Sequence, residues 1–483
     1  MTAIKDKISP QSFERSTQLM AGGLEPNHFD WAEAWYPVHY VKDLDKSKPT
    51  RFTLMDRAVV IWWEPPSQSW RVLADQCPHR LAPLSEGRIN EAGLLECPYH
   101  GWAFAGNGAC EHIPQQPLEG KAHLSNRACV DSMPTQVCQD LLFVYPGKPE
   151  NAARVSIPMI EPLAAEPDGW VMLNTFRDLP YDALTLLENV LDASHLPYTH
   201  HKTVSKRENA APMQMEVVSS DKHGFQGIWP EGPRKGKLGT QHTTFVAPSL
   251  MYHDLTSEQF GRTLTVVYAT PIRKGECRVF ARFPFKFSSK LPSLFIKLTP
   301  RWYSHIGNNR VLEDDQIFLH MQERLLEKAG NSLAERPSQR PYIQTCYLPT
   351  QADSYVVAFR KWVSEFASDP FPDQHLPSQQ STEALMDRYH SHTKHCSSCS
   401  LALQRIQIIR KAALVLMAIL WSFLPLVVAV SEPIPLPVSA LFVAIPLVTG
   451  ALWFWLGNLE QKFYKGQPTP PRNLPLPRSA KTR

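Results

Sequence analysis

This sequence of 483 residues has no excess of charge of either sign. Its 50 Lys and Arg against 46 Asp and Glu give a net charge of only +4. The basic residues are scattered among acidic ones, and no basic stripe with interleaved aromatic residues is present. Because such a stripe is the usual signature of nucleic-acid binding, we expect no nucleic-acid partner. Internal repeats are also absent, and the length suits two or three domains.

Cysteine is scarce as well. Nine cysteines, an odd number spread over the chain, do not form the pattern of a secreted disulfide framework. Residues 1–24 are polar and charged, so they lack the apolar core of a secretory signal. They also lack the long, Ser- and Arg-rich, acid-poor composition of a plastid transit peptide. We therefore expect a chain that works in a reducing compartment.

Two short clusters carry the strongest chemical signal. Cys77 lies just before His79, and Cys97 lies just before His100. Two Cys and two His from separate loops can hold a [2Fe–2S] cluster in which one iron takes both thiolates and the other both imidazoles. Structural zinc also accepts two Cys and two His, but its loops usually pair like ligands. The mixed loops therefore favour a Rieske cluster and the transfer of single electrons.

A second metal site is indicated by His195 and His200. On an ideal helix, this spacing would place them about 140° apart. Pro197 breaks the helix between them, so His200 can turn back and share a metal with His195. A carboxylate from elsewhere would complete a 2-His-1-carboxylate triad, which binds Fe(II) and leaves positions open for O₂.

The best candidate for this carboxylate is Asp315, because it stands at the start of a predicted helix over 315–328. Asp314 is the alternative. His201 is likewise an alternative to His200 as the second imidazole.

Two uncharged stretches lie near the C-terminus, at residues 412–430 and 438–457. Each is long enough to cross about 30 Å of hydrocarbon as a helix. The Pro-rich segment 431–437 would join them as a hairpin. Basic residues flank both outer ends, so the positive-inside rule places both ends and the rest of the chain on the cytoplasmic or stromal side. The alternative is a buried helical hairpin of a soluble core.

The pattern of strands and helices predicts an α+β protein. We expect these parts in order: an N-terminal extension (1–30), a β-sandwich with the cluster loops (31–148), a domain with the second metal site (149–365), a polar linker (366–405), two transmembrane helices (408–457) and a Pro-rich basic tail (458–483).

The motifs Cys-Pro-His-Arg and Cys-Pro-Tyr-His-Gly-Trp, followed by Asn-x-x-Asp-x-x-His-x₄-His, resemble the Rieske non-haem iron oxygenases over roughly residues 31–365. The Cys-x-x-Cys segment ahead of two membrane spans resembles the pheophorbide a oxygenase branch. Relatives of that branch include chlorophyllide a oxygenase and the Rieske protein of the chloroplast import translocon. The resemblance implies a Rieske domain followed by a helix-grip, START-like catalytic domain.

The same resemblance implies a function. Electrons from a ferredoxin-type donor would pass through the [2Fe–2S] cluster to a mononuclear Fe(II), where O₂ oxygenates a hydrophobic ring, most simply a chlorophyll-derived tetrapyrrole. The alternatives are a membrane-bound redox or electron-transfer component, and an oxygenase of another aromatic or sterol substrate. The expected location is a thylakoid or plasma membrane of a photosynthetic organism, by preference cyanobacterial.

The resemblance also implies roles by position. The cluster ligands would be Cys77, His79, Cys97 and His100, and the iron ligands would be His195, His200 and Asp315. Asp192 would bridge a cluster histidine of one subunit to an iron-binding histidine of the next, which implies a homotrimer. Asn189 would lie near the iron.

Cys396 and Cys399 form a Cys-x-x-Cys pair, which favours thiol redox chemistry. Two other interpretations remain open at this point. One is metal binding together with His390, His392 or His395, and the other is a pair of unreactive thiols.

Overall fold

The structure is a computed structural model that describes residues 29–329, 342–367, 369–430 and 436–474. Almost all of the expected N-terminal extension lies outside these described residues, as do residues 475–483 of the expected tail.

The chain forms two compact units. The first comprises residues 1–298 and 315–379, and the second comprises residues 299–314 and 380–483. The helix α6 (Arg301–Lys328) contributes residues to both.

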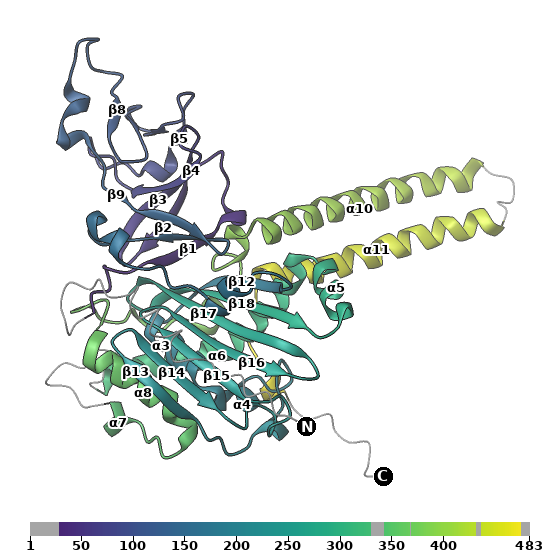
Figure 1. Cartoon of the computed structure of the whole chain (residues 1–483). Helices are drawn as coiled ribbons and strands as arrows, with labels where there is room; N and C mark the ends of the chain where they lie inside the picture. The colour runs from purple at the N-terminus through teal and green to yellow at the C-terminus, as the bar shows by residue number, and fades with distance from the viewer. Residues whose placement is uncertain (1–28, 330–341, 368, 431–435, 475–483) are drawn as a thin grey trace. The chain divides into compact units, whose positions relative to one another are not determined.

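Three small antiparallel sheets form the N-terminal part of the first unit (Figure 1). The first has the order β1 (Tyr36–Tyr40), β11 (Leu141–Val144), β10 (Thr135–Cys138). The second has the order β2 (Thr50–Leu54), β3 (Arg57–Glu64), β4 (Ser69–Ala74), β9 (Ser132–Met133). The third has the order β5 (Arg88–Ile89), β6 (Leu95–Glu96), β7 (Ala103–Phe104), β8 (Cys110–His112).

These strands form because their sequences combine β-branched and aromatic residues, which suit a pleated, buried surface. In β3, Val60 and Trp62 are fully buried. Their core continues through Leu95 to Cys77 and Cys97. The sheets therefore give the two Cys–His loops a rigid apolar base.

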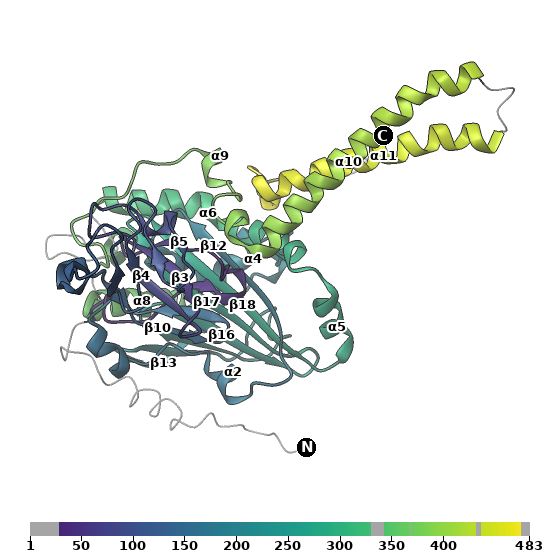
Figure 2. The same cartoon turned by 90° about the horizontal axis from the view of Figure 1, so that it is seen from above.

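The rest of the first unit is built on one seven-stranded antiparallel sheet. Its order is β12 (Val171–Leu179), β18 (Glu276–Phe287), β17 (Gly261–Arg273), β16 (Leu250–Ser257), β15 (Gln241–Val246), β14 (Gly224–Trp229), β13 (Glu216–Asp221). The helix α3 (Ala183–Leu191) packs against β16, β17 and β18, and α8 (Ser354–Trp362) packs against β13 and β14 (Figure 1). Figure 2 shows β16, β17 and β18 side by side in this sheet. Helices on an antiparallel sheet confirm the predicted α+β class. The shorter helices are α2 (Glu161–Ala165), α4 (Leu196–Thr199), α5 (Lys290–Leu298) and α7 (Tyr342–Thr345).

The helix α6 begins well before the predicted start at residue 315. The missed first turns bury polar side chains, among them His305, Asn309 and Glu313. A helix whose buried face is polar lacks the apolar periodicity from which a helix is predicted. Further along, Glu323 of α6 accepts the backbone N–H of Asp182 at 3.3 Å, which ties the helix to the segment before α3.

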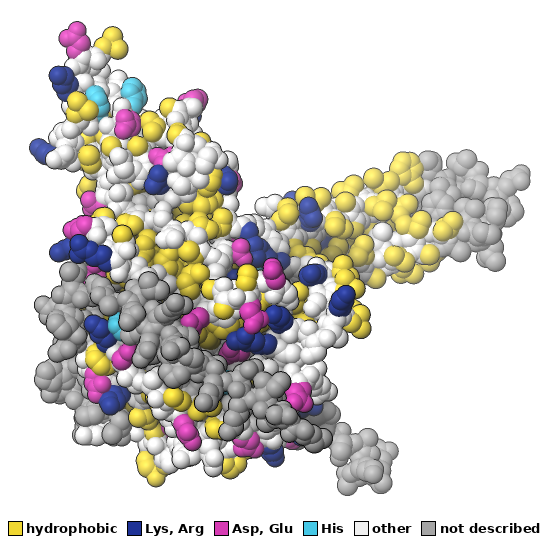
Figure 3. Space-filling model, in the orientation of Figure 1, with side chains coloured by type: hydrophobic (Ala, Val, Ile, Leu, Met, Phe, Trp, Pro, Cys, Tyr) yellow, Lys and Arg dark blue, Asp and Glu magenta, His cyan; other side chains and the backbone are white. Residues whose placement is uncertain are grey.

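In the second unit, α10 (Ser397–Val430) and α11 (Leu436–Tyr464) pair as an antiparallel hairpin (Figure 1). Apolar side chains cover the described parts of both helices (Figure 3). Two windows, Ser397–Phe423 and Val443–Tyr464, are long and apolar enough to cross a membrane, and only 11% of each is buried. The expected spans fall within the two helices. So much exposed apolar surface does not fit a buried hairpin of a soluble core.

The segment expected as a polar linker, 366–405, is folded over much of its length. It contains α9 (Thr382–Leu385) and the first turns of α10. Thr393 donates its hydroxyl to the Phe463 carbonyl at 2.7 Å, and the Arg388 amide bonds the Tyr464 carbonyl at 2.9 Å. The sequence predicts a linker here because its polar residues far outnumber its apolar ones and no helix or strand period is visible. Its few apolar residues, such as Phe371, Leu385 and Met386, are nevertheless buried.

Candidate metal centres

The two Cys–His loops share one backbone geometry. The amide of Cys77 bonds the Ala82 carbonyl at 2.9 Å, and the amide of Leu81 returns to the Cys77 carbonyl at 2.9 Å. In the second loop, the Cys97 amide bonds the Trp102 carbonyl at 2.8 Å, and the Gly101 amide returns to Cys97 at 3.1 Å. The fifth residue of each loop has a positive φ, 62° in the first and 75° in the second. Two matched turns therefore present one thiol and one imidazole each.

The cysteines and histidines of these loops differ in exposure. Cys77 and Cys97 are buried, whereas His79 is exposed and His100 is half-buried. The two imidazole rings lie 4.6 Å apart between centroids, and the His79 ring stacks on Trp102. A cluster held here would present its histidine-bound iron at the surface, where electrons can enter or leave.

The donor chemistry of this group fits a [2Fe–2S] cluster. Burial, assisted by the neighbouring Cys97 thiol, raises the pKa of the Cys77 thiol to about 12. A thiolate at this position therefore requires a bound metal to balance its charge. Among the described residues, these four ligands are more spread out than a compact metal group: their donor atoms do not all lie within 4.8 Å of one another. A single tetrahedral zinc would bring all four donors within about 4 Å, so the spread favours two irons.

The second centre brings together His195 and His200, which flank α4, and Asp315 of α6. His195, His200 and Asp315 place their donor atoms within 4.8 Å of one another. The His195 and His200 Nε2 atoms are 3.3 Å apart, and the Asp315 oxygens lie 3.3 Å from His200 Nε2 and 3.8 Å from His195 Nε2. Ligands at right angles around one iron lie about 3 Å apart, so this triangle has the size of an iron site.

Two observations indicate that a cation belongs between these groups. The Nδ1 of His195 faces the Asp192 backbone carbonyl, to which it donates when the ring is neutral. Its Nε2 then carries a lone pair directed at His200. Oδ1 of Asp315 is buried and has no hydrogen-bond partner among the described residues. A metal ion between these groups would take the His195 lone pair as a ligand and compensate the buried carboxylate oxygen, which is costly without a partner.

The structure also distinguishes the candidate iron ligands Asp315 and His200 from their alternatives, Asp314 and His201. Asp314 points its backbone carbonyl and carboxylate toward Arg472, and it is not in the metal group. His201 accepts the Arg207 amide at 3.2 Å and also lies outside the group. Of the residues considered from sequence, the structure therefore brings Asp315 rather than Asp314 to the two histidines.

The predicted bridging residue, Asp192, caps the turn that carries His195. Its carboxylate accepts the Ser194 amide at 2.8 Å and the Ser194 hydroxyl at 2.5 Å. Asn189 lies in the last turn of α3, and its carbonyl accepts the Asp192 amide at 3.2 Å. Both residues thus shape the backbone that aims His195.

Sequence reasoning missed His253, which lies on β16 close to this centre. Burial lowers its pKa to about 4, and the nearby His195 adds to this effect. The neutral ring bonds the Thr243 hydroxyl at 2.8 Å and the Val190 carbonyl at 3.0 Å. It therefore ties the sheet to α3 just before Asp192. No local motif marks a single histidine on a distant strand.

Comparison with known proteins identifies the family. Models of the Rieske [2Fe-2S] domain and of pheophorbide a oxygenase match residues 34–130 and 245–332. Pheophorbide a oxygenase of Oryza sativa subsp. japonica is 38% identical over 83% of this chain and 80% of its own length. The chain belongs to the pheophorbide a oxygenase family. Flavonoid 8-hydroxylase 2 of Ocimum basilicum is 33% identical over 84% of this chain and 79% of its own length.

A solved structure supports the fold of this family member. Dicamba monooxygenase bound to dicamba matches with a TM-score of 0.55 at 22% identity, over 69% of this chain and 97% of that chain. Membership in the pheophorbide a oxygenase family makes the chain an oxygenase with a Rieske [2Fe–2S] cluster and mononuclear iron. It uses O₂, a hydrophobic substrate and an electron donor.

The expected cyanobacterial thylakoid or plasma membrane is wrong. The pheophorbide a oxygenase of Oryza sativa and the flavonoid 8-hydroxylase of Ocimum basilicum are both chloroplastic proteins, which points to a plant chloroplast.

Proposed function

We propose that this oxygenase acts on a chlorophyll-derived tetrapyrrole and that His195, His200 and Asp315 bind its catalytic iron. The convergence of two imidazole nitrogens and one orphaned carboxylate is the observation that carries the iron assignment. The identity to a rice pheophorbide a oxygenase over 83% of the chain supports the substrate class. Cys77, Cys97, His79 and His100 hold the cluster, and a ferredoxin-type donor reduces it.

In this proposal the cluster supplies electrons one at a time, and the iron supplies open positions for O₂. The protein supplies geometry. The Asp192 carbonyl fixes the His195 tautomer so that Nε2 faces the metal. His253 stays neutral and adds no positive charge near the iron. The buried Asp315 carboxylate balances part of the metal's charge.

Another aromatic substrate is the second candidate, because a flavonoid hydroxylase matches 84% of the chain, although at the lower identity of 33%. The test begins with enzyme that has been reconstituted anaerobically with iron. This enzyme is then incubated with reduced ferredoxin, O₂ and a panel of substrates. The panel contains pheophorbide, chlorophyllide, a flavonoid and a sterol. Turnover confined to the macrocycles is expected. Faster oxidation of the flavonoid would assign the chain to the second candidate.

A role as a pure electron carrier is disfavoured by the assembled iron site. Such a carrier would need the cluster and not the second metal. If a His195→Ala variant kept full biological activity while Cys77→Ala lost it, the oxygenase proposal would fail.

Asp192 is proposed to relay electrons between subunits of a homotrimer, because it orients an iron-binding histidine and is itself half-buried. The Asp192→Asn variant should keep its iron and its trimer size, since the amide is nearly isosteric. Oxidation of the reduced cluster by O₂ and substrate should slow by about 10–100-fold, the usual effect of losing such a partner. Stopped-flow absorbance of the cluster measures this rate. An unchanged rate would leave Asp192 as a cap of the His195 turn alone.

The α10–α11 hairpin is proposed to anchor the enzyme in a membrane and to bring it to lipid-soluble substrate. A variant that lacks residues 412–457 tests this proposal. The remaining ends lie side by side, because Gln407 donates to Glu460 and to the Tyr464 hydroxyl, both at 3.0 Å. A short Gly-Ser turn can therefore replace the hairpin without disturbing the packing of residues 387–405.

The deletion variant should pass into the soluble fraction, whereas the full chain should resist extraction with alkaline carbonate. Its cluster spectrum should be unchanged. It should turn over detergent-dispersed substrate but lose activity on substrate embedded in vesicles. Continued retention of the deletion variant in membranes would rule out the hairpin as the anchor.

A further inference from the structure

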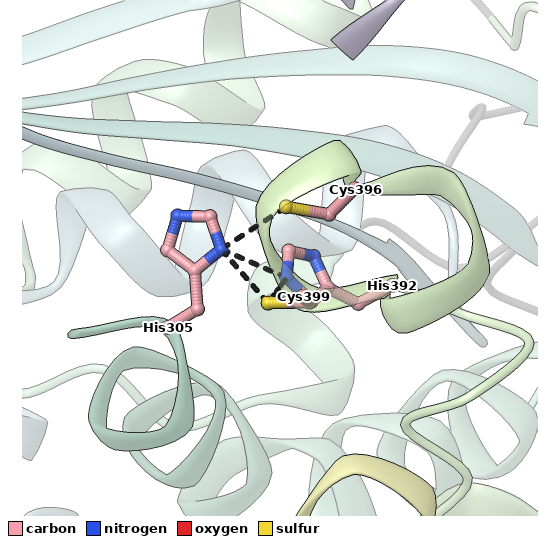
Figure 4. A group of neighbouring side chains, drawn as sticks. All are labelled: His305, His392, Cys396 and Cys399. Atoms are coloured by element: carbon pink, nitrogen blue, oxygen red, sulfur yellow. Dashed lines mark hydrogen bonds between the residues drawn. The ribbon is translucent and has the colours of Figure 1, made fainter. Parts of the chain in front are cut away.

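A second group of buried metal-binding side chains lies in the second unit, apart from both iron centres. It consists of His305, His392, Cys396 and Cys399, called here the Cys₂His₂ group (Figure 4). His305 comes from the first half of α6, Cys396 immediately precedes α10, and Cys399 lies in the first turn of α10. All four residues are between 0% and 2% exposed.

The four donor atoms converge on one point. His305 Nδ1 lies 3.0 Å from His392 Nε2, and it lies 3.4 Å from the sulfur of each cysteine. The sulfur of Cys399 is also 3.4 Å from His392 Nε2. Tetrahedral zinc with two thiolates and two imidazoles places its donors about 3.3–3.8 Å apart. The group is therefore close to the size of a zinc site and much too compact for a two-iron cluster.

The surroundings favour thiolates. Arg301 donates to the Cys396 sulfur at 3.3 Å, so a positive charge faces the pair. The cysteines also lie at the N-terminus of α10, a helix of 34 residues, where the helix dipole stabilises negative charge. The turn before this helix is rigid, because the Cys396 amide bonds the His392 carbonyl at 3.1 Å.

We propose that the Cys₂His₂ group binds one structural zinc ion. Two thiolates and two imidazoles in a closed tetrahedral arrangement are the ligand set that zinc takes in structural sites. The ion would join the start of α6 to the start of α10, and so fix the base of the hairpin within the second unit. This proposal is independent of the substrate and of the iron chemistry.

The group also bears on the sequence interpretations of the Cys-x-x-Cys pair. Of the three nearby histidines, only His392 belongs to it. His390 is exposed and bonds Asp387 at 2.5 Å, and His395 is half-buried outside the group. The fourth ligand, His305, comes from another helix and escaped prediction. Redox exchange needs a thiol that a partner can reach, whereas both cysteines here are buried and form no disulfide.

The test is a metal analysis of the full-length enzyme, purified in detergent under reducing conditions. Elemental analysis by inductively coupled plasma mass spectrometry should find about one zinc per chain in addition to the cluster and mononuclear iron. The Cys396→Ser/Cys399→Ser and His392→Ala variants should lose the zinc and keep the cluster spectrum. His390→Ala and Cys129→Ser are matched controls, because both side chains are exposed and lie outside the group, and they should keep it.

Cobalt substitution provides a readout that needs no variant. Co(II) bound by two thiolates should show intense d–d and sulfur-to-metal absorption bands, which a site without thiolates lacks. Three results would overturn the proposal. They are the absence of zinc after titration of the reduced protein, iron in place of zinc at this site, and a Cys396–Cys399 disulfide in the protein as purified.

Discussion

An Asp315→Ala variant is expected to lose its mononuclear iron while it keeps the two irons of its Rieske cluster. Two neutral imidazoles alone hold Fe(II) weakly, and the buried carboxylate is the negatively charged member of the group. Removing a residue that merely supports a ligand costs about 10–100-fold in metal affinity or activity. Loss of the ligand itself should therefore reduce turnover by more than about a hundredfold.

The measurement combines iron analysis with electron paramagnetic resonance. The reduced cluster should keep its signal in the variant, while the signal of the nitric oxide complex of mononuclear Fe(II) should vanish. Asp314→Asn is the matched control, because this neighbouring carboxylate faces Arg472 and lies outside the metal group. If Asp314→Asn lost the iron and Asp315→Ala kept it, the proposed ligand set would be wrong.

Features encoded by neighbouring residues could be predicted from the sequence. Each cluster loop carries its thiol and imidazole within one turn, so the pairs Cys77–His79 and Cys97–His100 are visible without knowledge of the fold. His195 and His200 are also close enough in sequence to be recognised as a pair. The expected helix break at Pro197 is wrong, because Pro197 stands in the first turn of α4, where proline is tolerated, and the two histidines flank this helix. The apolar hairpin is likewise a property of continuous composition.

Features that depend on pairing between distant segments could not be predicted. His305 meets the Cys-x-x-Cys pair only because α6 begins at Arg301, and its first turns have a polar buried face. His253 reaches α3 only through the order of strands in the seven-stranded sheet. In both cases the sequence around the histidine has no hydrophobic periodicity or motif that marks it. Tertiary packing alone determines which distant segment the histidine contacts.

A buried ion pair between distant segments could not be predicted from the sequence either. Substituting its arginine is expected to have the second large effect. Arg388 and Glu313 form a bidentate pair with two contacts of 2.6 Å, and both side chains are 5% exposed. Arg388 also donates to the Lys462 carbonyl at 2.9 Å, which joins the folded segment to the end of α11. A Cβ on Gly466 would stand 2.4 Å from the Glu313 carboxylate, so glycine is required beside the pair.

The Arg388→Met variant is expected to lower the local free energy of unfolding of the segment 386–396 by about 3–5 kcal/mol, because it removes the bidentate cationic partner of the buried Glu313 carboxylate. Each 1.4 kcal/mol is about a factor of ten, so amide hydrogen exchange in this segment should accelerate by about two to four orders of magnitude. Exchange measured by mass spectrometry resolves the segment from the rest of the chain.

Two further variants decide the interpretation. Arg388→Met combined with Glu313→Leu should recover most of the protection, since no charge is then left buried. Arg273→Met breaks an exposed pair with Glu276, in which the arginine side chain is 53% exposed, and it should change stability by less than about 1 kcal/mol. If the single Arg388→Met variant exchanged no faster than Arg273→Met, the pair would not be what holds this segment. If the double variant exchanged as fast as the single one, the loss would come from the missing arginine contact to Lys462 rather than from the loss of the ion pair with Glu313.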